Sequence, residues 1–301
     1  MKNKVCLVVT IVSFIASVAG LARPASPGPA QGQDKPEAVS LLGQNLYARP
    51  PAADVPKLEN ALRQASADLE RRPDDPEAVI AYGRALAGLQ RYREAIAAFT
   101  KGLAAHPDNA MLYRHRGHRY ITVREFGRAV DDLTRAAALN DHDYDIWYHL
   151  GLARYLRGEF DRAAPAYRSC LAAAQSPASR VAVSHWLYMT LRRLGDRTEA
   201  DRLLEDIKPG MDAGENKSYL SLLLFYKGLK TEKELQAEAS ATDLDGATIG
   251  YGLANWQLYS GRRDKAAAGF REIVALPYWP AFGLIAAEAE LVRLKHKAPA
   301  D

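Results

Sequence analysis

The sequence between residues 76 and 177 repeats at a fixed spacing of 34 residues, and this repeat limits the chain to very few folds. Four columns keep the spacing over three copies: Gly83, Gly117 and Gly151; Ala95, Ala129 and Ala163; Phe99, Leu133 and Tyr167; Gly102, Ala136 and Cys170. Small residues let two helices approach closely, while the large residue fills the space between one pair of helices and the next. Chance similarity between alanine-rich helices does not keep four columns in register.

The third copy carries a family pattern. It reads Trp147-Tyr148-His149-Leu150-Gly151 and continues with Ala163 and Tyr167. This resembles the W-x2-L-G and A-x3-F signature of tetratricopeptide (TPR) repeats. The resemblance implies an all-α fold in which helix–turn–helix repeats stack into a right-handed superhelical solenoid.

The sequence divides into five parts on this basis. We expect a signal peptide (1–22), a Pro/Gly-rich linker (23–56), a leading cap helix with three regular repeats (57–177), degenerate repeats with a C-terminal cap helix (178–295) and a tail (296–301). In the third repeat, Pro165 lies inside the second helix, where it should remove a backbone hydrogen bond and bend that helix.

The N-terminus has the layout of a secretory leader. Met1-Lys2-Asn3-Lys4 is basic, and the apolar run that follows ends in small residues. This predicts a periplasmic or secreted protein; the alternative is an uncleaved leader that tethers the chain to a membrane. The prolines of the linker predict an extended or disordered tether. Its apolar patch at residues 39–47 is interpreted either as a loop that packs loosely on the helices or as a docking segment.

Helical pairs continue less regularly after residue 177. Residues 181–194 with 198–207, 216–229 with 232–240, and 249–259 with 264–276 are expected to form them, followed by a last helix over 281–294. Its charged residues suit a solvent-facing cap: Glu288, Glu290, Arg293 and Lys295. The run from Leu222 to Phe225 suits either the core or an interface, which leaves a homodimer open.

The whole layout is similar to the NlpI-type envelope TPR proteins. The residues that carry this resemblance are Trp186-Leu187-Tyr188, Phe225-Tyr226-x-Gly228 and Tyr259-Ser260-Gly261-Arg262-Arg263-Asp264-Lys265-Ala266. The resemblance implies a dimeric adaptor that links peptidoglycan hydrolases to a periplasmic protease. That family is anchored by a lipid on a cysteine that follows the apolar run, and this chain has no such cysteine.

Little in the sequence indicates catalysis. A net charge of +4 is too small for a dedicated nucleic-acid partner. No phosphate loop, nucleophile elbow or zinc-protease motif occurs, so no catalytic residue, metal site or cofactor is predicted. His115 and His118 are spaced to share a metal, but no third ligand has a matching spacing. Asp141, Asp143 and Asp145 are better explained as helix caps.

The predicted site is the concave groove, which the first helix of each repeat lines in TPR proteins. Register places a basic and aromatic stripe there: Arg84, Arg114, His118, Tyr148 and Tyr155, with His115 and His149 beside them. Such a stripe suits an acidic or C-terminal peptide segment. The alternative is a merely solvated face.

The sequence therefore predicts an exported, non-catalytic scaffold or adaptor that binds protein segments in its groove. The second hypothesis is a structural module of an envelope complex that uses its convex face, tether or C-terminal repeats. An enzyme is the third, and no constellation of residues supports it.

Overall fold

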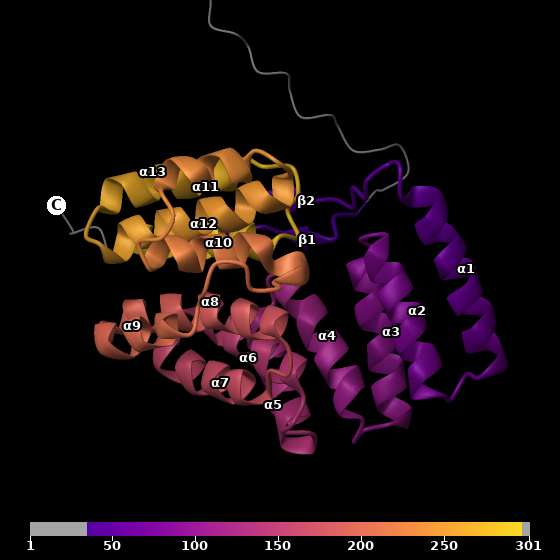
Figure 1. Ribbon diagram of the computed structural model, residues 1–301. Helices are drawn as coiled ribbons and strands as arrows, with labels where there is room; N and C mark the ends of the chain where they lie inside the picture. Colours follow the sequence, from indigo (N-terminus) through magenta and orange to yellow (C-terminus); the bar gives the residue numbers. More distant parts are fainter. Residues whose placement is uncertain (1–34, 297–301) are drawn as a thin grey trace, which may run out of the picture. The chain divides into compact units, whose positions relative to one another are not determined.

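A computed structural model describes residues 35–296, so the predicted leader, the start of the linker and most of the tail lie outside the described residues. Nearly everything from residue 55 onward is helical, which confirms the all-α prediction (Figure 1). The elements are β1 (Ala38–Val39), β2 (Asn45–Leu46), α1 (Val55–Arg71), α2 (Pro76–Gly88), α3 (Tyr92–Ala105), α4 (Ala110–Thr122), α5 (Phe126–Leu139), α6 (Tyr144–Arg157), α7 (Phe160–Ala173), α8 (Pro177–Leu194), α9 (Arg197–Glu205), η1 (Gly214–Asn216), α10 (Lys217–Tyr226), α11 (Glu232–Ala239), α12 (Asp243–Tyr259), α13 (Arg263–Ile273) and α14 (Phe282–His296). Within residues 35–296, no helix combines the length and the apolar character that crossing a bilayer requires.

The three regular repeats begin with the same cap. The side chains of Asp75, Asn109 and Asp143, spaced like the glycines, each accept a hydrogen bond from a backbone N–H in the first turn of α2, α4 and α6. Such caps satisfy backbone donors that have no partner within the helix. The repeat therefore specifies helix starts as well as helix packing.

The turn between the two helices of each repeat contains one left-handed residue. Its φ is 59° at Gln90, 67° at Arg124 and 81° at Gly158. Glycine adopts this conformation readily, whereas other residues do so only where the surrounding structure holds them. Gln90 is held because its side chain bonds both the N–H and the carbonyl of Arg49. Arg124 is held by a buried ion pair with Glu288 on α14.

The packing columns are confirmed. A Cβ added to Gly117 would lie 2.7 Å from Leu133 Cγ, and one added to Gly151 would lie 2.6 Å from a ring carbon of Tyr167. Both distances are too short for real contacts, so glycine is what lets α4 meet α5 and α6 meet α7. Leu222 and Leu223 of α10 are fully buried, so these two residues belong to the core and not to an interface.

A glycine that the repeat does not explain makes the closest contact. A Cβ on Gly283, at the second position of α14, would press into the Ala247 carbonyl of α12. We expect Gly283→Ala to destabilise the fold by about 1–3 kcal/mol, because the obstacle is backbone and cannot rotate away. Gly127→Ala, at the second position of α5, is the matched control; it adds a methyl group in ordinary contact and should be neutral or stabilising. Urea unfolding of both variants measures the difference, and equal stabilities would contradict the close packing of α12 on α14.

The part of the linker that the structure describes is ordered. Residues 37–46 form an antiparallel hairpin in which Ala38 pairs with Leu46 and Val39 with Asn45. Arg93 Nε donates to the Glu37 carbonyl at 2.8 Å, and Trp279 Nε1 donates to the Tyr47 carbonyl at 2.8 Å. The structure agrees with one of the two interpretations of the apolar patch at residues 39–47, a loop that packs on the helices. Within the patch, Tyr47 is held by Trp279 from the loop before α14, and the Leu41 N–H donates to Glu288 on α14.

The last helix also differs from its prediction. Glu288 and Glu290 are only 2% and 0% exposed, so α14 is not a solvent-facing cap. Glu288 pairs with Arg124, and Glu290 pairs with Arg193 on α8 and Arg293 on α14 itself. These pairs neutralise the carboxylates, which is why a charged helix can pack against α6, α12 and α13.

Candidate functional site

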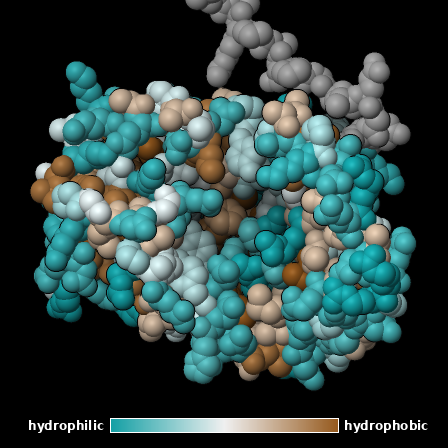
Figure 2. Space-filling view, turned by 45° about the vertical axis from the view of Figure 1, so that its right-hand side comes forward, coloured by the Kyte–Doolittle hydropathy of each residue, from teal (hydrophilic) through white to brown (hydrophobic). Residues whose placement is uncertain are grey.

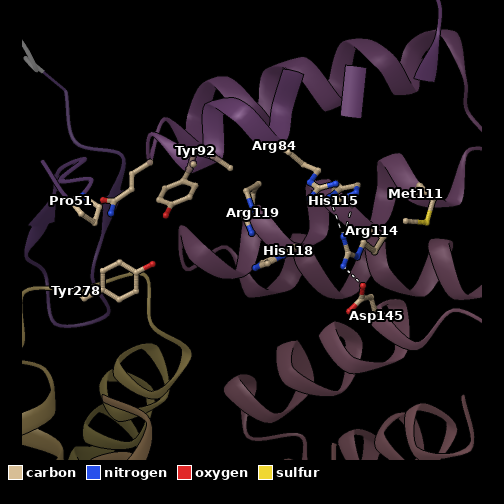
Figure 3. Close-up of a pocket in the computed structure, with 13 residues that line it drawn as sticks. Pro51, Arg84, Tyr92, Met111, Arg114, His115, His118, Arg119, Asp145 and Tyr278 are labelled. Atoms are coloured by element: carbon tan, nitrogen blue, oxygen red, sulfur yellow. Dashed lines mark hydrogen bonds and ion pairs between the residues drawn. The ribbon is translucent and has the colours of Figure 1, made fainter. Parts of the chain in front are cut away.

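A cavity of about 590 Å³ lies beside the first helices of the first two repeats, α2 and α4. Residues from α2, the turn after it, α4 and the starts of α3 and α6 line it, together with Pro51 and Tyr278 from distant parts of the chain. We call it the arginine cavity, after Arg84, Arg114 and Arg119, which all line it (Figure 3). In a space-filling view the face turned toward the reader is hollowed near its middle, and hydrophilic residues border the hollow on one side (Figure 2).

The three arginines have different surroundings. Arg114 forms an ion pair with Asp145 of α6 and contacts the His115 ring at 3.2 Å. Arg119 lies with its guanidinium 5.4 Å from the centre of the Tyr92 ring. Arg84 is exposed at the rim. Among residues 35–296, no carboxylate forms an ion pair with Arg84 or Arg119, so the cavity carries an excess of positive charge.

The histidines of the site are neutral at pH 7. Burial, together with the positive charges of Arg114, Arg84 and Arg119, lowers the pKa of His115 to about 3. Burial and the neighbouring Arg119 place the pKa of His118 well below its usual value. The His118 ring lies tilted against the His149 ring with centres 4.2 Å apart, and both rings contact Phe282 of α14. A neutral His118 can accept or donate one hydrogen bond without adding charge.

The structure brings only part of the predicted stripe together. Arg84, Arg114, His115 and His118 line the arginine cavity. Tyr148 and His149 are buried, and Tyr155 is 0% exposed because its hydroxyl bonds Tyr251 at 2.8 Å and Asn255 at 2.9 Å, both on α12. The prediction of an open groove at the third repeat is therefore wrong: the C-terminal helices fill the groove there.

Three cavity residues escaped the sequence reasoning. Arg119 lies one position past the stripe on α4, Tyr92 belongs to the second helix of repeat 1, and Tyr278 comes from the loop before α14. Their hydroxyl and guanidinium groups face the space between the two tyrosine rings and His118 (Figure 3). No local sequence pattern marks the two tyrosines, because the register locates the inner faces of the first helices and carries no information on α3 or on the loop before α14.

The other polar groups considered in the sequence have structural roles. Asp143 caps α6, and the Asp141 carbonyl accepts from Trp147 Nε1 at 2.7 Å. Cys170 is buried, and burial raises the pKa of its thiol. Within the described residues, no three His, Cys, Asp or Glu side chains gather as a metal site would require.

A model of the tetratricopeptide repeat family matches residues 55–110 and 115–179, the same stretch that carries the 34-residue spacing. The protein contains tetratricopeptide repeats. The match begins at α1, the helix expected to precede the three regular repeats as a cap.

Similar proteins share the repeats. Human tetratricopeptide repeat protein 13 is 29% identical over 141 residues, which are 46% of this chain and 16% of the human protein. Hsc70-interacting protein 1 of Drosophila melanogaster is 32% identical over 88 residues, 29% of this chain and 22% of the fly protein. The matched TPR region thus spans less than a quarter of each of these two relatives.

One solved structure extends the likeness to most of the chain. A tetratricopeptide repeat protein from Parabacteroides merdae aligns over 80% of this chain and 94% of its own, with a TM-score of 0.50 and 17% identity. At this identity the likeness shows the fold alone. It supports a TPR-type helical arrangement that extends past the regular repeats.

Proposed function

We propose that this protein is a non-catalytic adaptor that binds a segment of a partner protein in the arginine cavity. The observation that carries the proposal is the contrast along the face that TPR proteins use for binding. At the third repeat the chain's own helices fill that face, whereas at the first two repeats it is open and positively charged. An adaptor needs such an accessible, chemically distinct surface and no reacting groups.

The lining determines the kind of segment. Arginine pairs with carboxylates through two parallel hydrogen bonds, so an acidic segment suits the guanidinium groups of Arg84 and Arg119. Met111 and the ring of Tyr278 add apolar surface for the neighbouring side chains of that segment. The neutral histidines do not repel a cation strongly, but the arginines do, which disfavours a basic segment.

Export belongs to the same proposal. The basic and apolar layout of residues 1–22 supports a periplasmic or secreted protein, with membrane tethering through an uncleaved leader as the alternative. The resemblance to NlpI-type proteins supports envelope enzymes as partners and a homodimer as the assembly. A structural module that uses other surfaces is the competing function, favoured by the filling of the groove at the third repeat.

We expect a variant with Arg84→Gln, Arg114→Gln and Arg119→Gln to lose at least about tenfold in partner capture, since each replaced arginine removes a charge-assisted contact. The measurement is crosslinking and pull-down of the tagged full chain from its native cells, with quantification of each captured protein. Arg197→Gln, an exposed arginine on α9, is the matched control. Partners captured equally by all three proteins would show that binding uses another surface, as the structural module requires.

A further inference from the structure

Arg119 has an unusual place in the arginine cavity. Burial lowers its pKa to about 10, and the nearby positive charge of Arg114 acts in the same direction. Its position over the Tyr92 ring gives some cation–π stabilisation. No carboxylate among residues 35–296 compensates the charge of this half-buried side chain, and a partly desolvated charge without a partner is costly. An anion bound beside Arg119 would remove this cost.

The net charge of the side chains that line the cavity indicates how many negative charges the anion should carry. Three guanidinium groups contribute three positive charges, and Asp145, already paired with Arg114, contributes one negative charge. His115 and His118 contribute none at neutral pH, because the arginines and burial keep them unprotonated. Two positive charges are left, on Arg84 and Arg119. A group with two negative charges would balance them, whereas a single carboxylate balances one.

The cavity also holds more hydrogen-bond donors than the two oxygens of a carboxylate would use. The Tyr92 and Tyr278 hydroxyls line the cavity together with the guanidinium of Arg119 (Figure 3). On the opposite side, the Nε atom of Arg114 is buried and has no hydrogen-bond partner among residues 35–296. A phosphate monoester carries about −1.5 to −2 charges at pH 7 and offers three strong acceptor oxygens. A carboxylate offers two oxygens and one charge.

From this charge balance and donor set we propose that the group recognised in the arginine cavity is a phosphate monoester carried by a partner protein. This inference rests on the proposed function, because it specifies which chemical group of the bound segment enters the cavity. Arg119 and the two tyrosine hydroxyls bind the phosphate oxygens, and Arg84 at the rim adds the second charge. The cavity is large enough for the phosphorylated residue together with its neighbours.

The test compares three peptides with blocked ends and the sequence Ala-Ala-Gly-X-Gly-Ala-Ala, where X is phosphoserine, glutamate or serine. Binding to the full chain is measured by titration calorimetry at pH 7 and low salt, and inorganic phosphate is titrated in parallel. We expect the phosphoserine peptide to bind at least about tenfold more tightly than the glutamate peptide, because it carries an additional charge and acceptor. Arg119→Gln should remove this preference, and Arg197→Gln should leave it unchanged.

The outcomes separate this inference from the proposed function. Equal affinity for the phosphoserine and glutamate peptides, with loss of both in Arg119→Gln, would overturn the phosphate assignment and leave the acidic-segment adaptor standing. Binding of inorganic phosphate as tight as that of the phosphoserine peptide would overturn the requirement for a partner protein. If neither phosphate probe bound at concentrations up to about 10 mM, the phosphate assignment would be wrong, whatever the pull-down captured.

Discussion

The variant Glu288→Leu is expected to lose about 3–5 kcal/mol of unfolding free energy, because it leaves the buried Arg124 guanidinium without a carboxylate. In the native chain Arg124 Nη2 lies 2.6 Å from Glu288 Oε1, and both side chains are 2% exposed. Glu288 also accepts the Leu41 N–H at 3.0 Å, so the same substitution releases the hairpin from α14. The loss is measured by urea unfolding at pH 7.

The double variant Arg124→Met and Glu288→Leu tests the reason for this loss. When both charges are removed, no unpaired charge is left inside, and apolar side chains of similar size can replace a buried pair at little cost. The double variant should therefore be more stable than Glu288→Leu alone. Glu272→Gln, an exposed residue of α13, is the control and should change stability by less than about 0.5 kcal/mol. A double variant no more stable than Glu288→Leu would contradict this account.

The ion pair between Arg124 and Glu288 is also a contact that no sequence pattern predicts. The 34-residue spacing predicted α2 to α7 and their close packing, because those contacts join residues within one or two repeats. Glu288 pairs with a residue 164 positions away, and no local pattern records such a partner. Its charge, read alone, indicated a solvent-facing helix. The fold shows the reverse, since the helix is buried and its charges are neutralised by Arg124, Arg193 and Arg293.

The residues of the candidate site were likewise predicted only in part. Arg84, Arg114 and His118 were predicted, because their places on the first helices of the repeats follow from the register. Tyr155 was predicted by the same rule but is buried, because α12 occupies that part of the groove. Tyr278 was missed, because the loop that carries it reaches the cavity through tertiary contacts, among them those of Trp279 with Tyr47 and Arg124. Register therefore locates a repeat's inner face, and distant segments decide which part of that face stays open.

The second large effect is expected from acidification. Burial lowers the pKa of four histidines: His115 and His185 to about 3, and His118 and His149 to well below the usual value. In the unfolded chain each has a pKa near 6.5. Below pH 6.5 the unfolded chain therefore takes up protons that the folded chain cannot, and stability is lost as the pH falls from 6.5 toward 3.

The loss is large because the effects add. At pH 5 each of these histidines contributes a loss of up to about 2 kcal/mol relative to pH 7, so the four together approach the whole stability of a typical domain. Two carboxyl groups oppose this trend, since burial raises the pKa values of Glu37 and Asp132. Burial also acts on Glu290, but Arg293 and Arg193 hold its pKa below the usual value, so its ion pairs add to the loss at still lower pH.

The origin of the effect can be assigned to single residues. His185 stacks on Tyr219 with ring centres 4.6 Å apart, and its buried Nδ1 has no hydrogen-bond partner in the part of the chain that the structure describes. His185→Phe should therefore preserve the packing and remove one titrating group. His142→Gln replaces an exposed histidine and should leave the pH dependence unchanged. Urea unfolding of the three proteins at pH 8, 7, 6 and 5 gives the slope of stability against pH. We expect a slope equivalent to several protons in the native chain and about one proton less in His185→Phe. A native slope below one proton would mean that the histidines titrate freely in the fold, and the packing of His118 and His149 against Phe282 could not then be as close as the structure places it.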